Sequence, residues 1–263
     1  MTNRGAALMS IIEDLVIASR TLAEHGVIDS YGHASVRSET DAERYLMPRA
    51  IAPELVTEDD ILEFDLDSKP IDGRGRAVYN ERFIHGEIYK LRPDVKAIVH
   101  NHSPAVVPFS CTDAELRPIF HMSAFIGLGV PTWDIRDAQE GTDLLVRTPL
   151  LGESLARTLG RFPAALMRGH GSVVVGESLQ IAVGRTIYLE QNARMQFQAI
   201  LLSAPSGRIV FMDDKEVAAN VAWQEYGRAW NLWKTRWTAR LNAEKAAAQG
   251  AKWPYDSARN EGQ

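Results

Sequence analysis

The spacing of apolar side chains near the start of the chain is helical. It predicts a helix over residues 6–26, with Gly26 as its stop. Short apolar runs bounded by Gly, Pro or a turn follow this helix and predict strands at 32–36, 44–47 and 61–65. A second amphipathic pattern then predicts a helix from Asn80 to Leu91, with Asn80 as its N-cap.

The second half of the chain mixes strands and helices in the same way. Strands are expected at 97–99, 164–167 and 172–175, and helices at 151–159, at 178–202 and from about residue 215 onward. No repeat or low-complexity linker divides the chain, so we expect one α/β catalytic domain over 1–210 and a helical C-terminal extension over 211–263. Four tryptophans of the extension recur at helical spacing, either as a packing stripe or as a lid over an aromatic substrate: Trp223, Trp230, Trp233 and Trp237.

Composition narrows the class of protein. The 263 residues are 45% hydrophobic and 24% charged, which is typical of a globular protein. A net charge of −5 argues against nucleic acid as a partner, because binding the phosphate backbone requires a basic face. We expect no membrane span and no signal peptide, since no apolar stretch is long enough. A single cysteine, Cys111, excludes a disulfide framework within the chain and favours the cytoplasm.

Three histidines are the strongest chemical signal. His100 and His102 stand two residues apart at the end of a predicted strand, so their side chains point to the same side. His170 lies between two glycines, which permit unusual backbone angles and close approach. Three imidazoles with an open position are typical of a catalytic metal site. The alternatives are an H-x-H pair that binds nothing and a loop histidine that caps a helix or lines the core.

Further residues around these histidines form a more specific pattern. Glu81 and His85 lie four apart on a predicted helix, and Arg92-Pro93-Asp94-Val95 and then Ile98–His102 follow. This succession, between about residues 10 and 205, resembles the class II aldolase/adducin family, which includes L-fuculose-phosphate and L-ribulose-phosphate enzymes. The resemblance implies a three-layer αβα fold with a central, mostly antiparallel sheet, and a homotetramer with active sites near subunit boundaries.

The resemblance also assigns roles to residues. It implies that His100, His102 and His170 are metal ligands and that Glu81 is the catalytic base, able to touch the metal in the resting site. One divalent ion per subunit is expected. Zinc is favoured by the imidazole ligands, and manganese, cobalt, magnesium and ferrous iron are alternatives. Adducin-like members lose the metal site, whereas here every ligand position is filled.

The loops that hold phosphate in the family's sugar aldolases differ in this sequence. The corresponding positions read Gly32-His33-Ala34-Ser35, Pro48-Arg49-Ala50 and Tyr79-Asn80. Arg49 is suited to bidentate binding of a carboxylate, with His33 in support, although a surface ion pair with Glu54 or Asp59 is an equal alternative. Tyr79 is either a substrate contact or a packing aromatic. Together with Asn80, these residues predict a pocket for a flat, carboxylated substrate.

His121 occupies the segment in which some sugar aldolases carry a tyrosine that donates a proton. We expect His121 to be either an acid near the metal or a core histidine bonded to a backbone carbonyl. The stretches Ile84–Tyr89 and Ser103–Pro108 most resemble the family's decarboxylase branch, which acts on hydroxylated aromatic or ring-opened acids, such as 2-hydroxy-3-carboxymuconate semialdehyde.

The expected activity is therefore a metal-dependent decarboxylation of a small carboxylic acid of aromatic catabolism through a metal-stabilised enolate. The first alternative is class II retro-aldol cleavage of a hydroxy acid or sugar phosphate, which passes through the same kind of enolate. A non-haem iron oxygenase and a non-catalytic adducin-like module are weaker alternatives.

Overall fold

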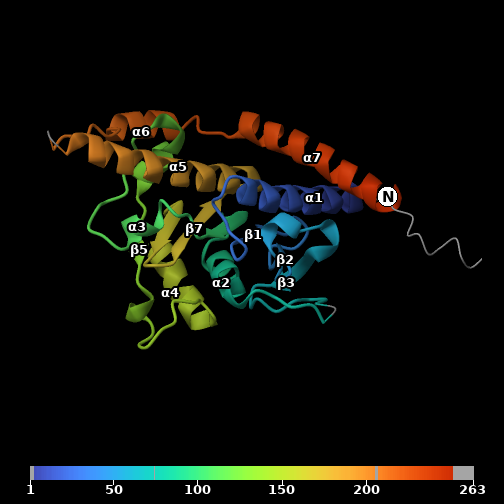
Figure 1. The fold of residues 1–263 in the computed structure, drawn as a ribbon. Coiled ribbons are helices and arrows are strands. Elements are labelled where there is room, and N and C mark those ends of the chain that lie inside the picture. The colour runs from blue at the N-terminus through green and yellow to red at the C-terminus, as the bar shows by residue number, and fades with distance from the viewer. Residues whose placement is uncertain (1–2, 74, 205–206, 251–263) are drawn as a thin grey trace, which may run out of the picture.

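A single mixed sheet organises the protein (Figure 1). The computed structural model describes residues 3–73, 75–204 and 207–250. The sheet has seven strands in the order β3-β2-β1-β4-β7-β6-β5, and neighbours are antiparallel except for the parallel pair β5 and β6. The strands are β1 (His33–Arg37), β2 (Arg44–Pro48), β3 (Ile61–Asp65), β4 (Ala97–Asn101), β5 (Thr132–Trp133), β6 (Ala164–Met167) and β7 (Gly171–Gly176).

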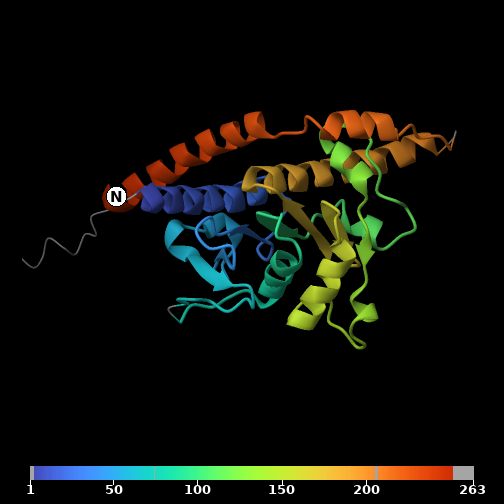
Figure 2. The ribbon, with the colours of Figure 1, turned by 180° about the vertical axis from the view of Figure 1, so that it is seen from behind.

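Helices cover both faces of this sheet. The α-helices are α1 (Asn3–Glu24), α2 (Phe83–Leu91), α3 (Val107–Ser110), α4 (Pro149–Leu159), α5 (Leu179–Ser203), α6 (Asp214–Val221) and α7 (Gly227–Gly250). The 3-10 turns are η1 (Pro53–Leu55), η2 (Glu58–Asp60), η3 (Asn80–Arg82), η4 (His121–Leu128) and η5 (Ile135–Asp137). In Figures 1 and 2, α1 and α5 lie along one face with α7 outside them, and α2 and α4 lie on the other.

Alternating side chains along the central strands separate the two main cores. Val99 of β4 packs with residues of α1 and α5, whereas its neighbour Ile98 packs with residues of α2 and α4. Both are fully buried, because a strand covered on two faces sends successive apolar side chains to opposite layers. The fold is thus the αβα architecture with a mostly antiparallel sheet that the sequence predicts.

The predicted helix from Asn80 to Leu91 begins later than expected. Residues 80–82 form the 3-10 turn η3, and the α-helix starts at Phe83. Glu81 has non-helical backbone angles (φ −90°, ψ 16°), and neither Tyr79 nor Arg82 makes a side-chain capping bond at these helix starts. The prediction that Asn80 is the N-cap is therefore wrong. The chain kinks where the Glu81 carboxylate turns to partners outside the helix.

The C-terminal extension packs back on the first helix. Trp230, Trp233 and Trp237 of α7 are buried in the same core as the apolar face of α1, and Trp223, which precedes α7, is 86% exposed. An ion pair between Lys234 and Asp14 (2.5 Å) links the same two helices. Residues 251–263 of the extension lie outside the described residues. None of the helices in the described ranges combines the length and apolar character that a membrane crossing requires.

Candidate metal centre and active site

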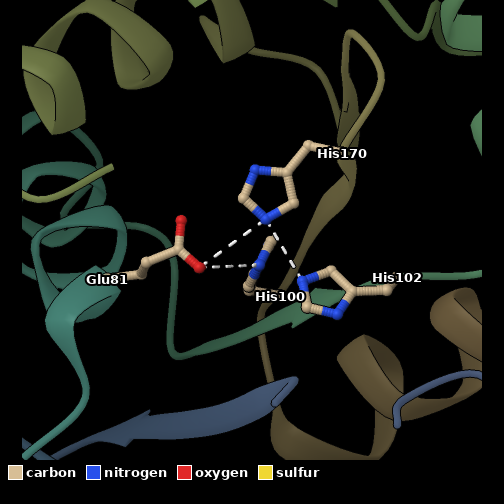
Figure 3. Close-up of side chains that lie close together, drawn as sticks. All are labelled: Glu81, His100, His102 and His170. Carbon is tan, nitrogen blue, oxygen red and sulfur yellow. Dashed lines mark hydrogen bonds and ion pairs between the residues drawn. The ribbon is translucent and has the colours of Figure 1, made fainter. Parts of the chain in front are cut away.

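Four side chains from separate segments meet at one end of the sheet (Figure 3). Glu81 comes from η3, His100 from β4, His102 from the segment after β4, and His170 from the turn before β7. One ligand atom of each lies within 4.8 Å of the other three. The pairing of Asn101 with Ser172 in the β4–β7 ladder brings the two histidine-bearing segments together. The structure therefore assembles all four of the residues that the sequence marked for a metal site.

The glycines that flank His170 have distinct structural roles. Gly169 has φ +65°, a backbone conformation that residues with a Cβ rarely adopt. Gly171 lies against β4 so closely that a Cβ there would be 1.9 Å from the carbonyl oxygen of Asn101. The Gly-His-Gly sequence is thus what allows this turn to reach the end of β4.

In each of the three candidate histidine ligands, Nδ1 points away from the cluster and faces an oxygen acceptor. These contacts join Nδ1 of His100 to the carbonyl of Ser172 (3.2 Å), Nδ1 of His102 to Oδ1 of Asp29 (3.1 Å), and Nδ1 of His170 to the carbonyl of Leu144 (2.8 Å). Since an oxygen acceptor requires a hydrogen on Nδ1, each neutral ring keeps its Nε2 lone pair free. Metal-binding histidines are commonly oriented in this way by partners outside the coordination sphere.

The inner nitrogens and the carboxylate fit a divalent cation. Nε2 of His100 is buried without a hydrogen-bond partner in the described structure, and Nε2 of His102 and Nε2 of His170 face each other at 3.1 Å. Oε2 of Glu81 lies 3.7 Å from the His100 nitrogen and 3.6 Å from the His170 nitrogen. Converging lone pairs repel one another unless a positive charge lies between them. Three imidazoles and one carboxylate are ligands that zinc and its first-row neighbours accept.

Glu81 is held as a carboxylate. Burial raises its pKa, but the contacts with His170 and His100 and the hydrogen bond from the Val146 amide outweigh burial, and lower the pKa to about 2. The Val146 N–H donates to Oε1 at 2.9 Å, which leaves Oε2 directed at the histidines. One carboxylate oxygen is thus fixed by the backbone, and the other is available for chemistry.

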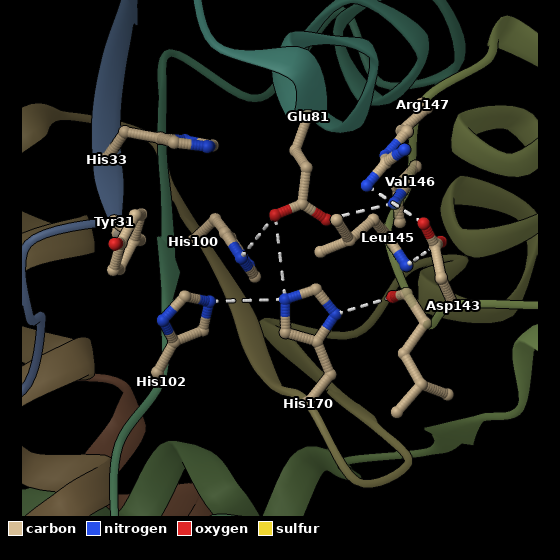
Figure 4. A network of polar contacts seen from close by, with 12 residues as sticks. Tyr31, His33, Glu81, His100, His102, Asp143, Leu145, Val146, Arg147 and His170 are labelled. Carbon is tan, nitrogen blue, oxygen red and sulfur yellow. Dashed lines mark hydrogen bonds and ion pairs between the residues drawn. The ribbon is translucent and has the colours of Figure 1, made fainter. Parts of the chain in front are cut away.

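A cavity of about 790 Å³ opens on this cluster. Figure 4 shows Tyr31 and His33 on one side of the cluster and Leu145 on the other. The lining comprises Ser30, Tyr31, His33, Ala50, Ile51, Ala52, Val78, Tyr79, Asn80, Glu81, His102, Leu144, Leu145, Gly169 and His170. Three of the residues expected to bind substrate, His33, Tyr79 and Asn80, therefore line the same cavity as Glu81.

Arg49, the fourth expected substrate contact, does not line this cavity. Its Nε donates to Oδ1 of Asp60 at 2.6 Å, so its ion pair is with neither Glu54 nor Asp59. Asp60 also accepts hydrogen bonds from Thr57 through Oδ2. The guanidinium thus joins the end of β2 to the turn η2, and its position favours the ion-pair alternative.

Tyr79 contributes its ring to the cavity and its hydroxyl to the backbone. The hydroxyl donates to the carbonyl of Ile51 and accepts from the Ile51 amide (3.4 Å). Burial raises the pKa of Tyr79 to about 12, so the phenol stays protonated. The ring packs against His33 with centroids 4.5 Å apart. Tyr79 therefore acts as an aromatic wall that positions its neighbour.

His121 lies in a second cavity, of about 600 Å³, that shares no lining residue with the first. Its neighbours there include Phe120, Glu216, Trp223 and Glu225. Within one chain, the structure does not bring His121 to the Glu81 cluster. Its expected place near the metal came only from a resemblance. In the fold, η4, which begins at His121, packs against α6 instead.

Several contributors to the site were not identified from the sequence. Asp29 holds the ring of His102 and also accepts from the amides of Tyr31 and Gly32, in a turn just before β1. An Asp followed within three residues by Gly is a turn signal, and it was available in the sequence. The contributions of Leu144 and Val146 come from their backbone, for which side-chain patterns give no signal.

The fold and the site define a class II aldolase-type lyase. Residues 13–197 match the family described as Class II Aldolase and Adducin N-terminal domain, and the chain belongs to this family. A decarboxylase of Talaromyces stipitatus, tropJ, is 34% identical over 244 residues, which cover 84% of this chain and 92% of the relative. The 3,4-dihydroxyphthalate decarboxylase of Arthrobacter keyseri is 29% identical over 217 residues, covering 78% of this chain and 84% of the relative.

A solved structure shares the same fold. L-fuculose 1-phosphate aldolase from Glaciozyma antarctica superimposes with a TM-score of 0.72, at 24% identity and with 94% of each chain covered. Decarboxylases and aldolases both cleave carbon–carbon bonds, so the relatives support a lyase.

Proposed function

We propose that this protein is a divalent-metal-dependent decarboxylase. Its substrate would be a hydroxylated aromatic acid, or a ring-opened di- or tricarboxylic acid of the muconate-semialdehyde type. The main support is that an ionised Glu81 and three converging imidazole nitrogens lie together at one cavity. The decarboxylase relatives support it over most of their length.

The lining of the cavity favours a flat acid over a sugar phosphate. Val78, Tyr79, Leu144 and Leu145 offer apolar and aromatic surface, and among the described residues the lining includes no Lys or Arg to hold a phosphate dianion. An aromatic ring can stack on such a surface, whereas a sugar leaves its hydroxyls without partners there. His33 and Asn80 supply polar contacts for the substrate's oxygens.

The proposed chemistry requires one proton to be taken and returned. A divalent ion bound by His100, His102 and His170 would stabilise the negative charge that develops on an oxygen conjugated with the reacting carbon. Oε2 of Glu81 accepts the proton of the substrate hydroxyl and returns it to the carbon that bears the carboxylate, so that the hydroxyl becomes a conjugated carbonyl. The bond to the carboxylate then breaks, and its electron pair moves onto this carbonyl oxygen as carbon dioxide leaves. Water re-protonates the product oxygen.

We further propose that the enzyme is a homotetramer with active sites near subunit boundaries. His121 lies outside the Glu81 cavity of its own chain, so a role as an acid would require a neighbouring subunit. Its single cysteine, Cys111, is compatible with a reducing compartment such as the cytoplasm.

The deciding experiment measures metal content and carbon dioxide release together. Purified protein is loaded separately with zinc, manganese, cobalt, magnesium or ferrous iron, and incubated with hydroxyphthalates, ring-cleavage acids and sugar phosphates. We expect about one ion per chain and carbon dioxide from a hydroxylated acid, with equal turnover under anaerobic conditions. Cleavage of sugar phosphates alone would establish the aldolase alternative, and a requirement for oxygen would establish an oxygenase.

A further inference from the structure

A chain of buried polar groups extends from the cavity into the core beneath it. Nδ1 of His33 lies 2.8 Å from Nε2 of His85, and Nδ1 of His85 lies 2.6 Å from the hydroxyl oxygen of Ser35. That oxygen lies 2.8 Å from the hydroxyl of Tyr89. Tyr89 is 1% exposed, and Ser35 and His85 are fully buried. The cavity end of this chain is His33, whose Nε2 has no hydrogen-bond partner in the described structure.

The direction of these hydrogen bonds follows from the number of hydrogens available. The chain of buried polar groups has three contacts, and each contact needs one hydrogen. Ser35 is the only hydrogen-bond partner of the Tyr89 hydroxyl in the described structure, so a Tyr89 hydrogen that is not donated to Ser35 has no acceptor. A buried O–H without an acceptor costs free energy. Tyr89 therefore donates to Ser35. The Ser35 hydrogen then has Nδ1 of His85 as its only acceptor in the described structure, so Ser35 donates to His85.

The same count determines the state of both rings. With Nδ1 of His85 acting as an acceptor, its single hydrogen is on Nε2 and is donated to Nδ1 of His33. Nδ1 of His33 is then without a hydrogen, so His33 is neutral and carries its hydrogen on Nε2. If the three hydrogen bonds ran the other way, Nε2 of His33 would face the cavity without a hydrogen, and His33 would act as a base.

We propose that His33 is a fixed N–H donor facing the cavity, and that His85, Ser35 and Tyr89 are positioning residues that hold it in this tautomer. This role of His33 rests on the proposed decarboxylase function. His33 selects substrates that place an acceptor oxygen, a carboxylate or an ionised hydroxyl, at this point of the cavity. It does not compete with Glu81 for protons.

The neighbours of His33 agree with a positioned ring. Tyr79 packs on one side of it (4.5 Å between centroids), and His100 lies 5.1 Å away. His33 itself is outside the group of residues whose ligand atoms converge. The ring is thus close enough to contact a substrate at the metal centre without being one of the four candidate ligands.

The direct test is nitrogen NMR of the zinc-loaded full-length protein with ¹⁵N-labelled histidine. The His33 signals are those that disappear in His33→Gln. We expect a hydrogen on Nε2 and none on Nδ1. A hydrogen on Nδ1, or on both nitrogens, overturns the proposal. Because the measurement needs no substrate, its outcome is independent of whether carbon dioxide is released.

Two deletions of buried hydroxyls test the positioning role. Ser35→Ala removes the only hydrogen donor to Nδ1 of His85 in the described structure, and we expect His33 to become a mixture of both tautomers. The matched control is Tyr45→Phe, since Tyr45 is a fully buried neighbour whose hydroxyl bonds instead to Ser68 (3.1 Å). This control should leave the His33 signals unchanged. An unaltered tautomer in Ser35→Ala, or an equal change in both variants, overturns the positioning role.

Kinetics test the function of the donor on whichever acid the enzyme decarboxylates. His33→Phe removes the N–H, and we expect KM to rise about tenfold or more, the size of a lost hydrogen bond to a charged group. His33→Gln keeps an N–H donor at a similar reach and should retain most of the affinity. If kcat falls while KM is unchanged, or if Gln fails to rescue, His33 is not a binding donor.

Discussion

Nε2 of His102 and Nε2 of His170 face each other at 3.1 Å, although Nδ1 of each ring is directed at an oxygen acceptor. Two neutral imidazoles arranged in this way point lone pairs at each other, and a cation between them relieves the repulsion. The acceptors, Asp29 and the Leu144 carbonyl, thereby determine which nitrogens are available as ligands.

Glu81→Gln removes the carboxylate that takes and returns the proton while preserving the shape of the side chain. We expect carbon dioxide release to fall about 10²- to 10⁴-fold, the usual contribution of acid–base catalysis. The matched control is Glu87→Gln on the adjoining helix, where Glu87 pairs with Lys90 rather than with the histidines. Rates are measured at saturating substrate, together with metal content. Equal rates in wild type and Glu81→Gln would show that Glu81 is not the catalytic acid–base group.

Asp29→Asn keeps an oxygen for the turn at Tyr31 and Gly32, but removes the negative charge behind His102. We expect metal affinity to fall about 10- to 100-fold, as is typical for partners of metal-binding histidines. Competition with a chromogenic chelator measures the affinity. Asp41→Asn is the control, because Asp41 forms a comparable turn with the Glu43 amide. An equal loss in both variants would indicate a general effect of charge.

Gly171→Ala places a Cβ 1.9 Å from the Asn101 carbonyl, so β4 and β7 must separate next to the metal ligands. We expect the free energy of unfolding to fall by about 1–3 kcal/mol or more and the metal affinity to fall with it. Gly227→Ala is the comparison, since its Cβ meets its nearest atom at 3.6 Å. Urea unfolding and metal titration would both be needed, and unchanged values in Gly171→Ala would refute the close approach.

Asp60 should make the stability of the β2–η2 region depend on pH. Partial burial raises the pKa of Asp60, but hydrogen bonds from Thr57 and Arg49 outweigh it and lower the pKa below its unfolded value of 3.8. A carboxyl with a lowered pKa stabilises the fold above 3.8, and this contribution is lost as the pH falls through the folded pKa. Asp60→Asn should therefore lower the urea midpoint at pH 7 and differ progressively less from wild type in acid. A gap that is independent of pH would contradict this account.

Mixed oligomers test whether His121 acts across a subunit boundary. Glu81→Gln and His121→Ala are each expected to be poorly active alone, because each lacks one group of the proposed site. Refolding the two together would restore activity if one protomer supplies Glu81 and its neighbour supplies His121. Full activity of His121→Ala by itself would remove this residue from the mechanism, and light scattering would report whether the tetramer forms.

Local sequence patterns were enough to locate most elements and to identify the candidate metal ligands. Periodicity located most helices and strands to within a few residues, and His100, His102 and His170 were recognisable because spacing and flanking glycines are local properties. The start of α2 was misplaced, because η3 is shaped by the contact between Glu81 and the distant Val146 amide. No local preference encodes such a contact.

Which polar side chains share a cavity depends on the folded arrangement of the strands and turns. Arg49 and His33 are both near the ends of strands, yet Arg49 pairs with Asp60 while His33 enters the cavity. The role of His85 depends on Ser35, fifty residues earlier, and on the antiparallel pairing that places β1 beside β4. Hydrogen-bond direction and metal-ligand tautomers arise from such long-range contacts, and so they follow from the folded arrangement rather than from residue spacing.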